Sequence, residues 1–170
     1  PEPPTLPLRP AAPTLNGEVI IEINRPLLGG LPEAGLDWIV YTNASPVIIN
    51  EVLEKNVGKL DILGARPDLI ELRNLLSEPV DLGGWGLTDE TAFPHKFTFP
   101  AGTIVPADGY LTLFADKNAA LPGLNTGFAL SDQGERLALH APAANGGVLM
   151  DELVFGFQVA DQSIGRFPPR

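Results

Sequence analysis

Hydrophobic and polar positions alternate along much of the chain, and this alternation predicts short β-strands. In the stretch "ERLALHA", Leu137 and Leu139 fall on one side of an extended chain, and three residues fall on the other: Arg136, Ala138 and His140. Successive side chains of a strand point to opposite faces of a sheet. One face of this strand is therefore expected to lie in a core and the other in water.

Similar segments recur from Val47 onward, separated by clusters of Gly, Pro, Asn and Asp. They are "VIINEVL", "DLIELRN", "WGLTD", "KFTF", "YLTLFAD", "ERLALHA" and "GVLMDELVFG". About seven short strands with turn residues between them are typical of an antiparallel β-sandwich or barrel. The leucines of the first two segments also fit helical spacing, but we predict strands because turn residues bound each segment and the remaining chain offers no other helices to pack on them.

The first 45 residues have a different pattern. Residues 1–16 hold six prolines and suit an extended linker. In residues 17–45, "EVIIEIN" and "LDWIVYTN" each read as a strand, and Val19, Ile21 and Ile23 share one side of the first. These two strands are too short a piece to form a domain alone.

Composition narrows the class of protein. The 170 residues fit one domain of ordinary size with an appendage. The net charge of −10 disfavours nucleic acid and anionic membranes as partners. The absence of cysteine excludes disulfides, thiolate metal sites and a cysteine nucleophile. No apolar run is long enough to span a bilayer, and the opening "PEPPTLPLRP" indicates a processed or excised chain without its signal peptide.

The order of segments in the second half resembles the lamin tail domain family. Asn50 and Glu51 of "VIINEV" precede "LIELRN", which is followed in turn by "VDLGGWGLTDE", "FPAGTIVPADGYLTLFA", "FALSDQGERLALHA" and "VLMDELVFG". The resemblance covers residues 46–157 and implies an all-β, immunoglobulin-like antiparallel β-sandwich. Residues 158–170 are then expected to form an extended C-terminal tail.

The resemblance also implies a cellular context. The closing "FGFQVADQSIGRFPPR" is similar to the segment that follows the domain in bacterial relatives, which occur in secreted and surface proteins. The rod of a true lamin is absent, because no heptad pattern occurs. Arg73 stands where many relatives carry an aromatic residue, and Gly84 stands where serine is usual. The family supplies no catalytic residues, so we expect a protein without enzymatic activity or cofactors.

The glycine-rich stretch "VDLGGWGLTDE" raises the question of an anion or cation site. A phosphate loop needs a helix after its glycines, whereas this stretch continues into predicted strands. We therefore interpret the glycines as a turn that places Trp85 in the core. Gly86 is expected to allow a close approach of the backbone. Asp89, Glu90 and Asp132 are the candidate calcium ligands, but a calcium cage needs more clustered acids. His95 and His140 lack the spacing of a metal-binding pair.

The N-terminal strands leave three alternatives open. "EVIIEIN" pairs with the chain's own sheet through Val19, Ile21 and Ile23, or with the edge of a neighbouring copy, or it is the remnant of an upstream domain. Head-to-tail pairing with a neighbour would build a filament.

Three functions remain in view. The first is a non-catalytic structural, adhesion or protein-interaction module, secreted or at the cell surface, that binds a protein partner or other copies of itself. The second is a filament subunit assembled by N-terminal strand donation. The third is an accessory domain of a secreted hydrolase or nuclease.

Overall fold

The computed structural model describes residues 9–10, 18–23, 37–42, 45–117 and 121–166. These residues belong to two compact units, which divide between Ser45 and Pro46. In the first unit, β1 (Arg9–Pro10), β2 (Glu18–Ile23) and β3 (Asp37–Thr42) form an antiparallel sheet in the order β1-β2-β3. Both strands predicted between residues 17 and 45 are therefore present.

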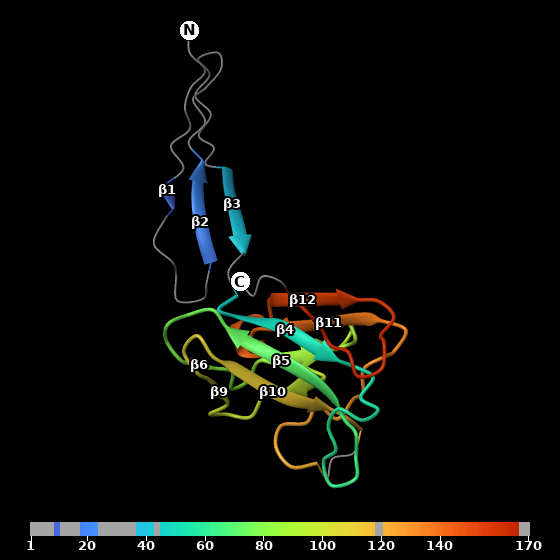
Figure 1. Cartoon of the computed structure of the whole chain (residues 1–170). Helices are drawn as coiled ribbons and strands as arrows, with labels where there is room; N and C mark the ends of the chain where they lie inside the picture. Colours follow the sequence, from blue (N-terminus) through green and yellow to red (C-terminus); the bar gives the residue numbers. More distant parts are fainter. Residues whose placement is uncertain (1–8, 11–17, 24–36, 43–44, 118–120, 167–170) are drawn as a thin grey trace, which may run out of the picture. The chain divides into compact units, whose positions relative to one another are not determined.

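The second unit is an immunoglobulin-like antiparallel β-sandwich, which confirms the predicted fold class. One sheet has the order β10-β5-β4-β13, built from β10 (Tyr110–Ala115), β5 (Asp68–Asn74), β4 (Val47–Leu53) and β13 (Ile164–Gly165). Figure 1 shows β10, β5 and β4 side by side. The second sheet has the order β12-β11-β7-β8, built from β12 (Leu149–Phe155), β11 (Glu135–His140), β7 (Gly86–Thr88) and β8 (Phe97–Thr98).

Short elements complete the sandwich. The strands β6 (Val80–Asp81) and β9 (Ile104–Val105) pair with each other. A 3-10 turn, η1 (Ala143–Asn145), lies between β11 and β12. The segments "VIINEVL" and "DLIELRN" are both strands, as predicted, and neither is a helix.

The core lies between the two sheets and is made of apolar side chains from both. Ile49, Ile70 and Leu72 come from the first sheet, and Leu87 and Leu137 come from the second; all five are fully buried. Removing such side chains from water contributes about 1.5–3 kcal/mol each. This burial holds the two sheets together.

The turn that begins the "VDLGGWGLTDE" stretch places Trp85 in this core. The Trp85 backbone N–H donates to the Leu82 carbonyl at 2.9 Å, and Gly84, the third residue of the turn, has φ of 81°. Such a positive φ is easy only for glycine. Trp85 is 8 % exposed, so the prediction that this turn seats the indole in the core is confirmed.

One prediction about β11 was wrong. Ala138 was placed on the wet face with Arg136 and His140, but it is fully buried, whereas Arg136 and His140 are half-buried. The methyl group of alanine is shorter than its neighbours on the same face, and Ala138 pairs with buried Thr88 on one side and with Glu152 on the other. A short side chain between longer ones is covered by them.

The C-terminal boundary also needs a correction. Residues 158–170 were predicted to form an extended tail, but the described part of this segment, up to Arg166, is attached to the sandwich. Gln158 is fully buried and β13 pairs with β4 through Ile164 and Gly165. The sandwich therefore extends past the predicted end at residue 157.

Candidate protein-interaction surface

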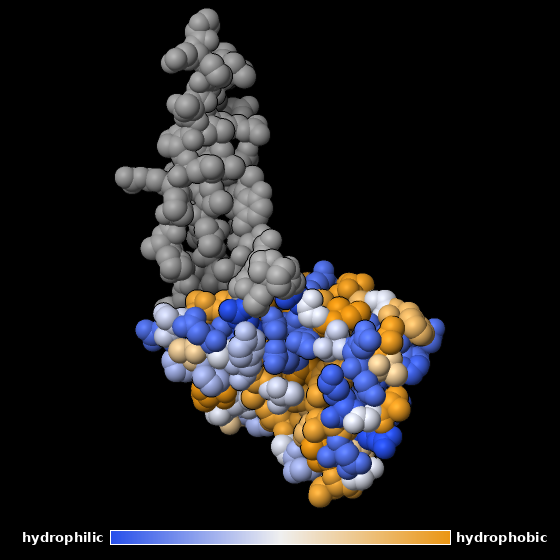
Figure 2. Space-filling model, in the orientation of Figure 1, coloured by the Kyte–Doolittle hydropathy of each residue, from blue (hydrophilic) through white to orange (hydrophobic). Residues whose placement is uncertain are grey.

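The sheet β10-β5-β4-β13 has an outer face on which polar and apolar side chains stand in rows. Thr112, Glu71 and Glu51 are aligned across β10, β5 and β4. The next row contains Leu69 of β5 and Leu53 of β4, which are also register partners. In the view of this sheet, Figure 2 shows hydrophilic and hydrophobic surface next to each other.

A β-bulge in β4 produces this arrangement. The register of β4 against β5 shifts between Ile49 and Glu51, so Asn50 is the extra residue. Without the bulge, strict alternation would put Ile49 and Glu51 on one face. With it, Ile49 and Val52 are both fully buried in the core while Glu51 faces Glu71. Bulges commonly re-aim a side chain at a functional site.

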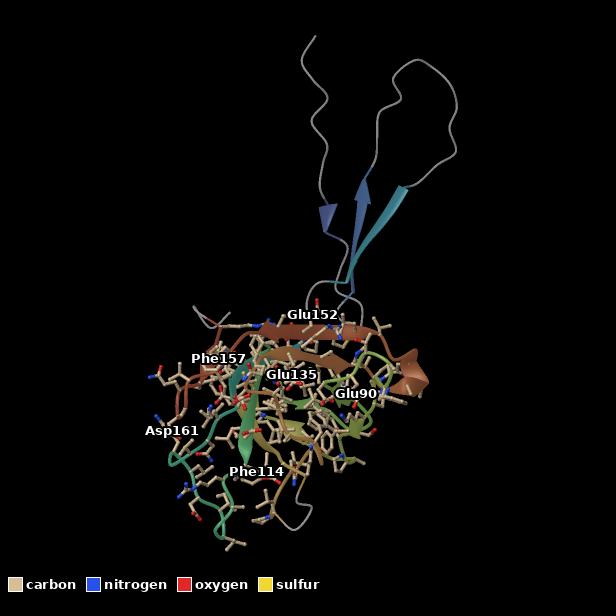
Figure 3. All side chains as sticks on the ribbon, turned by 90° about the vertical axis from the view of Figure 1, so that its right-hand side faces the viewer. Glu90, Phe114, Glu135, Glu152, Phe157 and Asp161 are labelled. Carbon is tan, nitrogen blue, oxygen red and sulfur yellow. The ribbon has the colours of Figure 1, made fainter. Side chains whose placement is uncertain are left out.

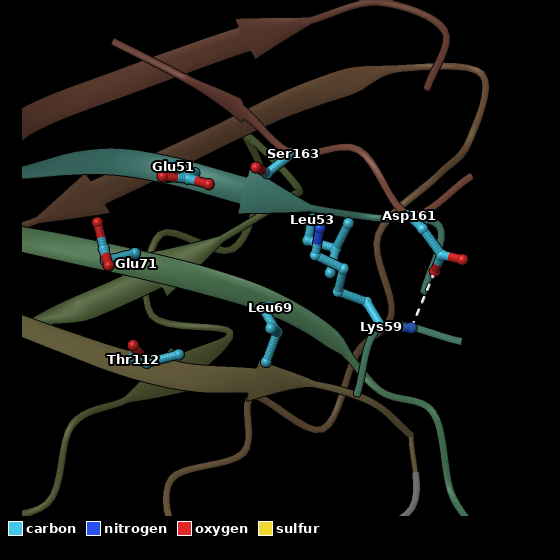
Figure 4. A pocket seen from close by; sticks show the side chains of 8 residues that line it. All are labelled: Glu51, Leu53, Lys59, Leu69, Glu71, Thr112, Asp161 and Ser163. Carbon is cyan, nitrogen blue, oxygen red and sulfur yellow. Dashed lines mark hydrogen bonds between the residues drawn. The ribbon is translucent and has the colours of Figure 1, made fainter. Parts of the chain in front are cut away.

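The outer face contains a hollow of about 210 Å³ next to these rows. Its lining joins three parts of the chain: the β4–β5 strands with the loop between them, β10, and the segment before β13. The lining residues are Glu51, Leu53, Lys59, Leu69, Glu71, Thr112, Asp161 and Ser163 (Figure 4). The two leucines give the hollow an apolar part, and the carboxylates give it a negative rim.

Glu51 and Glu71 are like charges in directly opposite positions of neighbouring strands. Among the described residues, neither forms an ion pair with a basic side chain. Arg73 lies two residues from Glu71 on the same strand, but its guanidinium stacks over the Tyr110 ring, 5.5 Å from the ring centroid. Opposed like charges on a sheet are unfavourable, so the fold itself gains nothing from this pairing.

Replacing Glu51 with glutamine should therefore stabilise the sandwich. The substitution keeps the shape of the side chain and removes the repulsion, which is worth about 0.2–1 kcal/mol. Urea unfolding at neutral pH would measure the gain. Glu78→Gln, an exposed glutamate outside the strands, is the matched control, and an equal gain in both variants would show that net charge alone is responsible.

The structure places the three candidate calcium ligands next to lysines. Asp89 and Glu90 both form ion pairs with Lys96, at 2.8 Å for Asp89. Asp132 forms a separate ion pair with Lys55 at 3.2 Å. Within the described ranges, no three acidic or histidine side chains are grouped so that they could hold a metal ion.

The first unit pairs the N-terminal strand residues internally. Val19 is opposite Tyr41, Ile21 is opposite Ile39, and Ile23 is the partner of Asp37. On its other side, β2 pairs with β1 over two positions only, Arg9 with Glu22 and Pro10 with Ile21.

The two histidines lie close together, which their sequence spacing did not indicate. Their ring centroids are 6.3 Å apart. His95 Nε2 bonds to the Ala141 carbonyl at 2.9 Å and His140 Nδ1 bonds to the Gly147 carbonyl at 3.0 Å. Since a carbonyl only accepts, each of these nitrogens donates its proton, and both rings serve to fasten the loop between β11 and β12.

The carboxylate of Asp161 fixes the loop at one end of the hollow. Asp161 Oδ1 accepts the backbone N–H groups of Val57, Gly58 and Lys59 at 2.8, 2.9 and 3.1 Å. The N–H groups of Gly58, Val57 and Lys59 hold the pKa of Asp161 below its usual range. Figure 3 shows Asp161 and Phe157 toward the same side of the sandwich, away from Glu90.

Replacing Asp161 with asparagine should loosen this loop. The amides of Val57, Gly58 and Lys59 are expected to exchange faster with solvent at pH 7, because a neutral amide oxygen accepts less strongly than a carboxylate. Since the folded pKa is lowered, this stabilisation is present above the pKa of the unfolded chain and is lost as the pH falls through the folded pKa. Amide exchange measured by NMR checks the faster exchange in the variant, and repeating it at lower pH checks the loss of stabilisation.

Asp108→Asn is the control for that experiment, because Asp108 also has a positive φ, 50° against 59° for Asp161. Faster exchange of the same three amides in the Asp108 variant would contradict a specific role of Asp161.

Sequence reasoning did not predict the hollow. Asn50, Glu51 and Glu71 stood in the pattern of the resemblance, but the bulge that brings them together has no signal in a single sequence. Their juxtaposition became visible only from the strand register.

Comparison with known proteins completes the description. The model of the lamin tail domain matches residues 41–156, more than half of the chain. No curated protein matches this chain. No helix in the described part of the chain is long and apolar enough to cross a membrane. Domains of this family are immunoglobulin-like modules that mediate protein interactions, and on its sequence match and its fold this chain belongs to the lamin tail domain family.

Proposed function

We propose that this protein is a non-catalytic structural or adhesion module, secreted or at the surface of a bacterial cell, that binds a protein partner or other copies of itself. The observation that carries the proposal is the outer face of the sheet β10-β5-β4-β13, with a hollow of about 210 Å³ beside two glutamates that face each other. The opposed glutamates of this face do not stabilise the fold, and the face is suited to contact with a partner. The similarity of the closing "GRFPP" segment to bacterial extracellular relatives supports the location.

The location is tested on the cells that make the protein. Intact cells are treated with an impermeant protease and with an impermeant cross-linker, and the protein is followed by immunoblot. Cleavage and cross-linking on intact cells are expected. Protection until the cells are lysed would refute a surface location, and recovery from the culture medium would support secretion.

Filament assembly by N-terminal strand donation is a second candidate. It is favoured by the short β1, which leaves most of the length of β2 without a partner on that side among the described residues. A strand from another copy could pair there. Light scattering after size exclusion, with and without residues 1–24, together with negative-stain microscopy, tests this. A monomer in both cases would refute strand exchange.

A further inference from the structure

We infer that Glu51 and Glu71 bind a basic side chain of a protein partner, arginine foremost, whose apolar stem lies against Leu53 and Leu69. This inference deepens the proposed function and rests on it, since it names the chemistry of the partner at the outer face. Four features of this face carry it: an uncompensated pair of charges, a buried amide beside them, a hollow of suitable size, and the charge of the whole chain.

The charge pair comes first. Residues directly opposite each other in neighbouring strands have Cβ atoms about 5 Å apart, and Glu51 and Glu71 are such partners. The other charged groups around them are Lys59 and Asp161 on the lining of the hollow and Arg73 on β5. Among the described residues, neither Lys59 nor Arg73 forms an ion pair with either glutamate. The guanidinium of Arg73 stacks on the Tyr110 ring instead. A cation between the two carboxylates would turn an unfavourable pair into a favourable triplet.

Asn50 provides a second, independent observation. It is 7 % exposed, and its Nδ2 donates to Glu71 Oε1 at 2.7 Å. Its Oδ1 is buried and has no hydrogen-bond partner. An unpartnered buried acceptor costs roughly 1–3 kcal/mol. The bulge thus holds a buried amide against the head group of Glu71 and fixes that carboxylate beside Glu51, where a partner would meet two acceptor groups.

The hollow fits the rest of such a side chain. Lysine and arginine lay their methylene stems along apolar surface while their charged ends stay with polar groups. Leu53 and Leu69 are the row next to Glu51 and Glu71, and they line the same hollow of about 210 Å³. Figure 4 shows both leucines beside the two glutamates on this face. Arginine is preferred to lysine because its planar, five-donor guanidinium can bond to two carboxylates together.

The net charge of −10 adds a long-range contribution. An acidic protein attracts basic segments before contact and repels nucleic acid and anionic lipid. The partner is therefore a protein segment that carries arginine or lysine next to apolar residues.

The test uses the peptide acetyl-Leu-Arg-Leu-Arg-Leu-amide as the probe and the full chain labelled with 15N. Addition of the peptide is expected to shift amide signals in β4, β5 and β10, with an affinity that falls as salt is added. The same peptide with citrulline in place of arginine keeps the shape and lacks the charge, and it is expected to bind at least tenfold more weakly. The double variant Glu51→Gln with Glu71→Gln should lose affinity by tenfold or more, whereas Glu78→Gln should keep it.

The inference is overturned if the peptide shifts signals only outside these strands, or if the double variant binds as tightly as Glu78→Gln. Signals of the unbound variants show that they are folded, because glutamine keeps the acceptor that Asn50 uses. The surface experiment separates the two proposals. If the protein is cross-linked on intact cells and the cross-link also forms with the double variant, the arginine site is refuted and the proposed function stays in place. A protein that is never exposed outside the cell refutes the proposed function, whatever the peptide does.

Discussion

Replacing Gly86 with alanine is expected to lower the free energy of unfolding by about 3 kcal/mol, the upper part of the usual range for overpacked sites. A Cβ at this position would lie 2.4 Å from the Pro94 carbonyl oxygen and 2.7 Å from Cδ2 of His95. Real Cβ atoms do not approach other atoms so closely, and one of the two obstacles is backbone. The chain from Pro94 to His95 would have to move off β7, and the contact of His95 with Ala141 would move with it.

Urea unfolding followed by tryptophan fluorescence measures this loss. Gly156→Ala is the control, since a Cβ at Gly156 meets nothing within 4 Å, and its stability should stay within about 0.5 kcal/mol of the natural chain. Equal effects of the two substitutions would contradict the close approach at Gly86.

Replacing Asp68 with asparagine is expected to stabilise the protein at pH 8 and to have little effect near pH 4. Burial raises the pKa of Asp68 to about 7, with further contributions from Glu54, Asp116 and Glu135, while the Leu130 N–H bonded to Asp68 opposes the rise. In the unfolded chain the carboxyl has the ordinary aspartate pKa of 3.8. Between these two pKa values, ionisation favours the unfolded state, so stability is lost as the pH rises toward 7 and the loss levels off above it.

The gain at pH 8 should be about 1–2 kcal/mol. The full shift would correspond to more, but Asp68 is half-buried, and solvent screens such a group. Asparagine keeps an oxygen for the Leu130 N–H, so the bond itself survives. Urea unfolding at several pH values from 4 to 8 gives the difference between variant and natural chain.

Asp81→Asn serves as the control for that series, because Asp81 is exposed and caps the turn through the Gly83 N–H. Its effect should not vary with pH in the same way. A gain for Asp68→Asn that is the same at pH 4 and pH 8 would contradict the raised pKa.

The fold was largely predictable because alternation and turn residues are local signals. Val47 to Leu53 and Asp68 to Asn74 were predicted as strands, and both are strands. The roles of Gly84 and Gly86 beside Trp85 were also predictable, because a positive φ at Gly84 and a close backbone contact at Gly86 each require glycine. These features depend on neighbours in sequence.

The candidate surface was not predictable because it depends on register. The sequence of the segment "VIINEVL" does not indicate a β-bulge at Asn50. Without the bulge, Glu51 would be assigned to the same face as Ile49. The raised pKa of Asp68 has the same origin, since it comes first from burial and then from Glu54 and Glu135, which only the fold brings near. The position of Glu51 on the outer face and the pKa of Asp68 both depend on tertiary structure.

The C-terminal segment was missed for a related reason. "QVADQSIGR" has no alternating pattern, and only two of these described residues pair as a strand. Its attachment comes from single contacts with distant groups: Asp161 with the loop after β4, and Arg166 Nη2 with Asp151 Oδ1 at 3.0 Å and the Glu152 carbonyl at 2.7 Å. Single long-range contacts leave no periodic trace.

The pairing of β13 with β4 has a consequence for the order of folding. The last described strand of the sandwich lies against its first strand, with Gly165 opposite Glu51. During synthesis, β4 leaves the ribosome long before β13 does, and for that time one edge of β4 has no strand beside it. A nascent chain in this state exposes an unpaired edge that other chains can bind. The strand β13 thus closes this edge only after the other strands of the sandwich have been made, and a chain that ends before β13 would keep the edge of β4 open.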